Sequence, residues 1–172
     1  MQARICLVLS CISAALLGAC ATPASGPSAS ADLQARSGSA VSGKVRFSEA
    51  GGKLRVEALV SGLTPGEHGF HIHEAGDCSA PDAASAKGHF NPAGKVHGHH
   101  AGNERHGGDM PNLVANAAGE ARFAGEISGL SLSGASGVVG RSVVVHADPD
   151  DYKSQPAGNS GKRIACGVIV AR

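Results

Sequence analysis

Residues able to bind metal ions are concentrated in one glycine-rich stretch, residues 87–109. Its 23 residues contain five of the nine histidines of the chain and end in Asp109. Imidazole and carboxylate groups at irregular spacing reach a common ion only where the backbone is free to curl, which glycine permits and a regular helix or strand does not. Taken alone, the stretch fits a metal-binding loop, a solvated surface loop or an unspecific metal-binding tract.

Histidines on either side of this stretch favour the metal-binding loop. His71 and His73 are two residues apart in an extended run, so both side chains project from one face, while Phe70 and Ile72 take the other. His146 ends a second apolar run. Three strand histidines with one loop histidine form a nitrogen-rich site suited to Cu(II). Three loop histidines with the closing aspartate form a tetrahedral set suited to zinc.

The elements that must position these residues are strands, because apolar and polar residues alternate with a period of two. Glycine-rich turns separate the alternating runs, and no stretch of a dozen residues has helical periodicity. We expect strands near residues 41–47, 54–60, 69–73, 113–117, 121–127, 138–146 and 164–170. Seven or eight short strands predict an all-β fold, an antiparallel sandwich or barrel.

The first 38 residues predict export, not folding. Residues 1–19 form a signal peptide in which Arg4 precedes an apolar run, too short to span a membrane. Cys20 lies where a bacterial lipobox places its acylated cysteine, which predicts membrane attachment through an N-terminal lipid. The alternative is an ordinary signal cleaved near Ala19 or Ala21. Residues 20–38 are expected to be a flexible tether, and residues 39–172 the folded domain.

The charge balance argues against a nucleic-acid partner. The chain has 15 basic and 14 acidic residues, for a net charge of +1. Removal of the signal peptide takes away only Arg4, which leaves 14 of each sign. Because the mature chain is formally neutral, attraction of nucleic acid, a bulk membrane or a charged substrate cannot come from the overall charge. Any such attraction must be local.

Five runs of sequence are specific enough to compare with known families: GFHIHE (69–74), GHFNP (88–92), ERHGGD (104–109), VVVHADPDD (143–151) and GKRIACG (161–167). Together they resemble the copper/zinc superoxide dismutases, in particular their exported bacterial branch. The resemblance extends from about residue 40 to residue 172 in unbroken order. It implies a Greek-key antiparallel β-sandwich or flattened, immunoglobulin-like barrel, with long loops that bind metal and form the rim of a substrate channel.

The resemblance implies a ligand set for one copper and one zinc ion per subunit. The implied copper ligands are His71, His73, His89 and His146. The implied zinc ligands are His89, His97, His106 and Asp109, so that His89 bridges the two ions. His99 and His100 are surplus; either could replace His97, but the spacing to His89 and His106 favours His97. His68 is expected to make a structural hydrogen bond.

Further roles follow from the same resemblance. Asp150 is expected to hydrogen-bond one copper histidine and one zinc histidine and so to orient both. Arg163 is expected beside the copper opening, where it acts in catalysis with His89 by binding a small anion. Lys153 and Lys162 are expected to add positive potential at the channel rim.

Two cysteines, Cys78 and Cys166, remain once the signal peptide and the lipid site are set aside. An exported domain is expected to pair them, and they match the intrachain disulfide of the family.

The implied activity is conversion of superoxide to dioxygen and hydrogen peroxide by a monomer or homodimer in the bacterial cell envelope or periplasm. The alternative is a non-enzymatic copper- and zinc-binding envelope lipoprotein on the same fold, which needs metal affinity but no anion gate. A copper-only relative is disfavoured because the zinc set is retained.

Overall fold

The computed structural model describes residues 26–172; the predicted signal peptide, Cys20 and residues 21–25 lie outside this range. The described part contains ten strands and one short 3₁₀ helix, η1 (Ala84–Ala86). The strands are β1 (Ser28–Ala35), β2 (Ser42–Ala50), β3 (Lys53–Ser61), β4 (Gly66–His68), β5 (Phe70–His73), β6 (Leu113–Ala115), β7 (Ala121–Ile127), β8 (Ser142–His146), β9 (Arg163–Val168) and β10 (Val170–Ala171).

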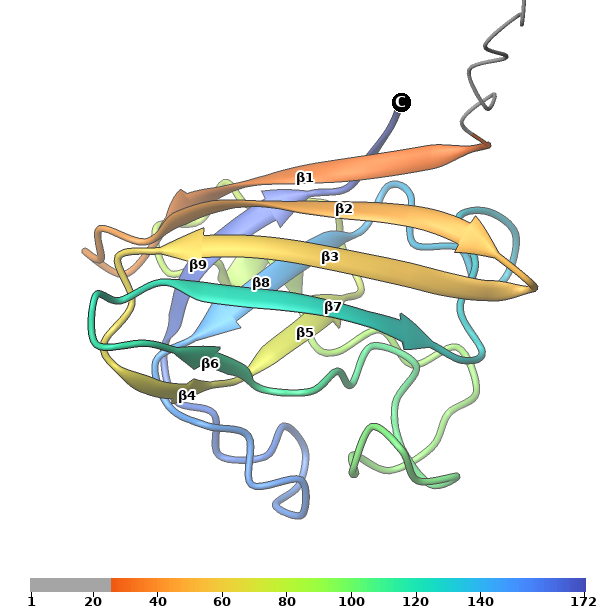
Figure 1. The fold of residues 1–172 in the computed structure, drawn as a ribbon. Helices are drawn as coiled ribbons and strands as arrows, with labels where there is room; N and C mark the ends of the chain where they lie inside the picture. Colours follow the sequence, from red (N-terminus) through yellow and green to blue (C-terminus); the bar gives the residue numbers. More distant parts are fainter. Residues whose placement is uncertain (1–25) are drawn as a thin grey trace, which may run out of the picture.

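The strands form one antiparallel sheet that closes almost completely on itself. Its order is β4-β6-β7-β3-β2-β1-β9-β8-β5, with β10 paired to β1. The two end strands, β4 and β5, follow each other along the chain, separated only by Gly69. Figure 1 shows the resulting flattened barrel, with β1, β2, β3 and β7 in front and β9, β8 and β5 behind. The predicted all-β fold is confirmed.

The core lies between these two layers, as the period-two pattern requires. In β3 the burial alternates strictly, with Leu54, Val56, Ala58 and Val60 inside and their neighbours exposed. The opposite layer contributes Phe70 and Ile72 of β5 and Val143 and Val145 of β8, all fully buried. Since side chains on each strand alternate between core and exterior, every polar residue next to these core residues faces away from the barrel interior.

The predicted tether is wrong from Ser28 onward, and the folded domain begins there and not at residue 39. Strand β1 pairs with β2 over six residue pairs and with β9 over two. Its sequence alternates serine and alanine, which resembles a linker, yet Ala29, Ala31 and Leu33 are 2%, 0% and 4% exposed. The small alanine side chains pack against the core, and composition alone hid this amphipathic pattern.

The strands also differ from the predicted ones in a late start, a division and an additional strand. The strand expected from residue 138 begins only at Ser142, because residues 138–141 form a turn in which Arg141 N–H donates to the Val138 carbonyl. The last strand divides into β9 and β10. Strand β4 was not predicted; its three residues pair with β6.

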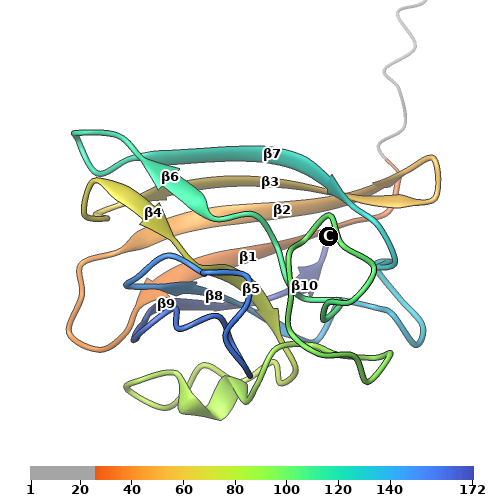
Figure 2. The same ribbon diagram turned by 90° about the horizontal axis from the view of Figure 1, so that it is seen from below.

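Two long segments leave the barrel on its metal-binding side: residues 74–112 between β5 and β6, and residues 147–162 between β8 and β9. Figure 2 views the same barrel from below, where both segments project beside β5 and β8. The predicted disulfide between Cys78 and Cys166 is confirmed, with Cα atoms 5.7 Å apart, and it ties the first segment to β9. The disulfide thereby holds the first segment against the rear layer.

Candidate metal centre

Strand β5 turns its two histidines away from the barrel core. Phe70 and Ile72 occupy the core side, so His71 and His73 face outward, under the long loop that follows. The loop returns to the edge of β5: Ile72 N–H donates to the Gly108 carbonyl at 3.0 Å, and Phe90 N–H donates to the Ile72 carbonyl at 2.8 Å. Isolated bridges pair His73 with His89 and His71 with Asp109. Residues far apart in sequence are therefore fixed side by side.

The first cluster consists of His71, His73, His89 and His146, all buried, with one ligand nitrogen of each within 4.8 Å of the others. The hydrogen bonds select the tautomers. His71 Nε2–H donates to Asp150 Oδ2 at 2.8 Å, and His73 Nδ1–H donates to the Lys87 carbonyl at 2.8 Å. Each of these two rings therefore directs its other nitrogen, with a free lone pair, into the cluster.

The cluster nitrogens fit a metal ion. His71 Nδ1 and His89 Nε2 are buried and have no hydrogen-bond partner among the described residues. His146 Nε2 lies 3.4 Å from His73 Nε2, so two acceptors face each other. Buried lone pairs directed at one point are costly unless a cation binds them. Four imidazole nitrogens form a donor set that suits copper.

The second cluster is gathered around one carboxylate oxygen. Asp109 Oδ1 lies 2.8 Å from His89 Nδ1, 3.1 Å from His97 Nδ1 and 3.4 Å from His106 Nδ1. The other oxygen of Asp109 accepts the backbone N–H groups of His106 at 2.8 Å and Gly98 at 3.1 Å, which fixes the carboxylate. Three imidazoles and one carboxylate are the donors of a closed tetrahedral zinc site.

His89 belongs to both clusters. Its Nδ1 faces Asp109 and its Nε2 points into the copper-type cluster. Its ring stacks on that of His71, with ring centroids 3.9 Å apart. One imidazole whose two nitrogens serve two sites is the arrangement of a bridging ligand.

Asp150 links the clusters from outside. Its Oδ2 accepts from His71 Nε2 at 2.8 Å, and its Oδ1 accepts from His97 Nε2 at 2.9 Å. Asn112 holds Asp150 in place, accepting the Asp150 N–H at 3.0 Å and donating to the Asp150 carbonyl at 3.1 Å. A single carboxylate thus orients one histidine of each cluster.

The acid–base properties of the clusters follow from burial and from the two carboxylates. Burial lowers the pKa of His89 to about 4, against the hydrogen bond to Asp109. Burial and neighbouring histidine charges hold the pKa values of His73 and His146 well below the usual range. These imidazoles are neutral near pH 7, as metal ligands must be.

The two carboxylates remain ionised. Burial by itself would raise the pKa of Asp109, but hydrogen bonds from His106, His89 and His97 hold it far below the usual range. Burial likewise opposes the charge of His97, yet Asp109 and Asp150 raise the pKa of His97 to about 9. Zinc at this cluster would therefore take the place of a proton on His97 Nδ1, because the negative charge that favours the proton also favours the cation.

Arg163, at the start of β9, lies opposite His146 in the β8–β9 register. Its guanidinium is half-buried and donates to the Ala83 carbonyl at 2.7 Å. Its charge contributes to lowering the pKa values of His73 and His146, after burial and the neighbouring histidine charges. The structure therefore places a fixed cation beside the copper-type cluster. Lys153 and Lys162 are exposed on the adjoining segment.

The surplus histidines lie apart from both clusters. His99 and His100 pack together, with ring centroids 4.1 Å apart, and His99 contacts the Tyr152 ring at 4.7 Å. His68 makes the structural hydrogen bonds expected of it, to the carbonyls of His146 and Thr64, both at 2.8 Å. The nine histidines thus divide into six in the clusters and three outside them.

Several residues that support the site carry no signal in the sequence. Gln155 pairs with the backbone of His97, accepting its N–H at 3.0 Å and donating to its carbonyl at 2.9 Å. Gly158 has a φ of 66°, and a Cβ atom there would overlap the Asp150 carboxylate. The backbone carbonyl of Lys87 selects the His73 tautomer. Such contacts join distant positions, so neither periodicity nor spacing reveals them.

Replacing Asp150 with asparagine is expected to lower the affinity for both metals by roughly 10- to 100-fold. The amide oxygen can satisfy only one of the two imidazole N–H groups, and the amide NH₂ group would face the other. Metal retention during dialysis against a chelator measures the effect. Asp151→Asn is the matched control, since Asp151 is exposed and bonds only residues of its own segment. Equal retention by both variants would contradict the assigned role.

Comparisons with known proteins agree with this geometry. The family described as copper/zinc superoxide dismutase matches residues 41–169. A Deinococcus radiodurans protein named superoxide dismutase [Cu-Zn] is 44% identical over 157 residues, covering 84% of this chain and 85% of the relative. A second, from Aquifex aeolicus, is 44% identical over 75% of this chain and 79% of its own length.

A solved structure is also similar. The crystal structure of the clock protein EA4 superimposes with a TM-score of 0.77 at 40% sequence identity, covering 83% of this chain and 93% of its own.

Proposed function

This chain belongs to the copper/zinc superoxide dismutase family, and from that premise we propose a role for each residue of the two clusters and a place of action in the cell. The activity itself follows from the family: two superoxide ions and two protons become dioxygen and hydrogen peroxide. The cofactors are copper and zinc.

His71, His73, His89 and His146 are proposed to bind copper; His89, His97, His106 and Asp109 are proposed to bind zinc. The single observation that carries this assignment is the position of His89, with one nitrogen in each cluster. The donor types support the division, since four imidazoles suit copper and three imidazoles with a carboxylate suit zinc.

The chemistry divides between the ions and the protein. Copper, when bound, supplies alternating one-electron oxidation and reduction, whereas zinc has no redox chemistry. His89 Nε2 is buried, has no partner among the described residues and belongs to a ring whose pKa is about 4. Because Nε2 opens into the copper-type cluster, a proton taken up at this nitrogen would be positioned for transfer to the product, so His89 would supply one of the two protons that peroxide requires. Asp109 keeps the ring oriented through Nδ1.

A superoxide-decay assay on protein reconstituted with both metals tests the assignment. We expect rapid decay only when both metals are bound. The alternative of a non-enzymatic metal carrier on this fold predicts tight binding without dismutation. The relatives bear the name of the enzyme, which favours the enzyme.

Replacing Arg163 with alanine is expected to lower the rate of superoxide decay roughly tenfold at low ionic strength and to flatten its dependence on salt. The reason is the loss of the half-buried cation that attracts and positions the anion beside the copper-type cluster. Arg122→Ala, on the opposite layer, is the matched control. If both variants lost activity equally, Arg163 would have only a general electrostatic effect.

We further propose that the chain acts in the bacterial cell envelope, held by an acyl group on Cys20. The LGAC sequence at residues 17–20 and the disulfide support this location, because disulfides persist in oxidising compartments. Among residues 26–172 no helix is long and apolar enough to cross a membrane. Expression with a radiolabelled fatty acid tests the proposal: label and membrane association should both disappear in Cys20→Ser. An unlabelled wild-type chain would refute it.

A further inference from the structure

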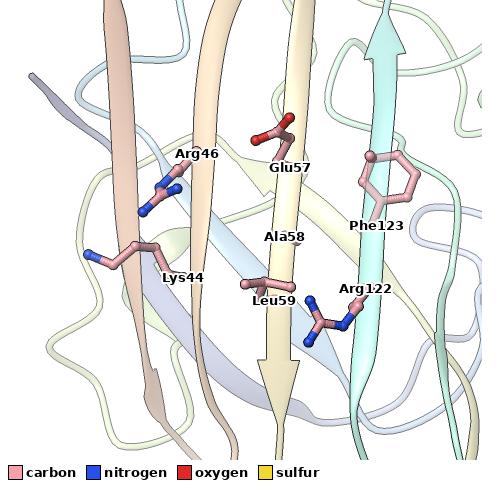
Figure 3. Close-up of a pocket in the computed structure, with 8 residues that line it drawn as sticks. Lys44, Arg46, Glu57, Ala58, Leu59, Arg122 and Phe123 are labelled. Carbon is pink, nitrogen blue, oxygen red and sulfur yellow. The ribbon is translucent and has the colours of Figure 1, made fainter.

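The outer face of the front layer gathers basic side chains. Paired residues of the ladder share a face, so Lys44, Leu59 and Arg122 form one row across β2, β3 and β7, and Arg46 and Glu57 lie in the next. Figure 3 shows Lys44 and Arg122 on either side of Leu59. We call the outward basic residues of this layer, with the last residue of the chain, the cationic face: Lys44, Arg46, Lys53, Arg55, Arg122 and Arg172.

Four acidic residues share this face, Asp32, Glu57, Glu120 and Glu126, which leaves it with an excess of two positive charges. Three of the four acids are already paired: Asp32 with Lys44 at 2.7 Å, Glu57 with Arg55 at 2.9 Å and Glu126 with Lys53 at 2.9 Å. Arg46 and Arg122 have no carboxylate within 4.0 Å in the described part of the chain. Since the mature chain is neutral overall, this excess is a property of one face.

The cationic face is also hollowed and partly apolar. A depression of about 420 Å³ lies over β2, β3 and β7, with Leu59 and Phe123 among its lining residues. Leu59 is 52% exposed. A second depression of about 350 Å³ shares Lys44 and Arg46 and extends to Ser28, the first residue of β1. Basic side chains around an exposed apolar residue suit the headgroup region of an anionic membrane.

The start of the fold limits how far this face can lie from the proposed anchor. Eight steps along the chain separate Cys20 from Ser28, which span at most about 28 Å even when fully extended. A domain of this size has a radius of gyration of roughly 15 Å, so the connection is no longer than the domain is wide. An acylated Cys20 therefore keeps the Ser28 end of the cationic face next to the membrane, at a high effective concentration.

The metal clusters lie on the other side of the molecule. Lys44 and Arg46 alternate with the core residues Val45 and Phe47 and so point out of the front layer. His71 and His73 point out of the rear layer by the same alternation. Contact through the cationic face consequently leaves β5 and β8, with their histidines, on the side away from the membrane, as the two layers in Figure 2 indicate.

We propose that the cationic face docks on the anionic lipid headgroups of the membrane that carries the N-terminal anchor, with the metal centre facing away from the bilayer. The orientation in the cell rests on the acylation of Cys20 proposed above; the affinity of the face for anionic lipid does not. The occupant is the lipid surface because the short connection brings the face to it and because the excess charge of the face is positive.

Vesicle binding by the mature chain with Cys20→Ser, loaded with both metals, tests the affinity without an acyl group. We expect binding to vesicles of phosphatidylglycerol and phosphatidylcholine, none to phosphatidylcholine alone, and weakening by salt. Each basic side chain near an anionic surface contributes about fivefold to the binding constant. The double variant Arg46→Glu with Arg122→Glu changes the charge by four units and should weaken binding by at least about 100-fold.

The matched control is Lys153→Glu with Lys162→Glu, the same charge change on the segment beside the metal clusters. It should bind anionic vesicles much better than the first double variant. Equal losses in the two variants, equal binding to both kinds of vesicle, or no binding to either would overturn the proposal. Superoxide decay in solution confirms that Arg46→Glu with Arg122→Glu is folded and active, so failure of docking leaves the dismutase function untouched.

The orientation has its own readout in the acylated, metal-loaded chain. On anionic vesicles an amine-reactive reagent should label Lys44 more slowly than on neutral vesicles, whereas Lys153 should be labelled equally on both. The labelling rate of Lys44 without vesicles is the reference, because Lys44 is paired with Asp32 in the free chain as well. Unchanged labelling of Lys44 would refute the orientation even if the chain is acylated.

Discussion

Replacing His89 with glutamine is expected to lower the rate of superoxide decay by at least about 100-fold in protein supplied with both metals. A glutamine side chain has no ring with a nitrogen on each side, so it cannot join the two clusters as Nδ1 and Nε2 of His89 do. The replacement also removes the buried ring nitrogen that is proposed to pass a proton to the product. Decay of a superoxide pulse, with metal content measured on the same samples, gives the result.

His99→Gln is the control for that measurement, because it makes the same change in the same loop at an exposed residue outside both clusters. It should retain the metal content and the rate of the unmodified chain. A His89→Gln variant that bound both metals and kept its full rate would contradict the bridging role. A large loss in His99→Gln would show that the loop responds to any histidine replacement.

Removing the disulfide is expected to lower the free energy of unfolding by about 4 to 5 kcal/mol, according to the loop-closure model. The bond joins residues 88 positions apart, so it restricts more than half of the unfolded chain. Replacing both Cys78 and Cys166 with serine avoids an unpaired thiol. Denaturant unfolding of the metal-free variant, compared with the metal-free original, measures the difference.

The same variant is expected to change the copper opening. The segment after Cys78 contains Ala83, whose carbonyl accepts from Arg163 at 2.7 Å. Without the disulfide the guanidinium loses a fixed partner, so the salt dependence of superoxide decay should flatten, as it should in Arg163→Ala. Ser85→Ala is the control in this segment, since it removes only two local hydrogen bonds, one donated to the Asp77 carbonyl and one accepted from the Ala80 N–H. Equal free energies of unfolding for Ser85→Ala and for the double serine variant would refute the predicted stabilisation by the disulfide.

The sequence by itself determined the fold class and named the residues that the structure gathers into two candidate metal clusters. Strict alternation, as in residues 54–60, predicts a strand with one buried face because side chains on a strand point alternately to its two sides. The histidines at 71 and 73 follow from the same geometry. Motifs as specific as GFHIHE and ERHGGD identified the family, so the order of the ligands along the chain could be assigned before any coordinates.

The tertiary structure decided everything that depends on contacts between distant positions. It placed His89 between two clusters, set Asp150 against His71 and His97, and recruited residues 28–35, which composition had assigned to a tether. It also divided a chain of net charge +1 into a cationic face and an opposite side that carries the histidine clusters. Alternation specifies which side chains share a face of a strand, but only strand pairing and loop closure specify what that face meets.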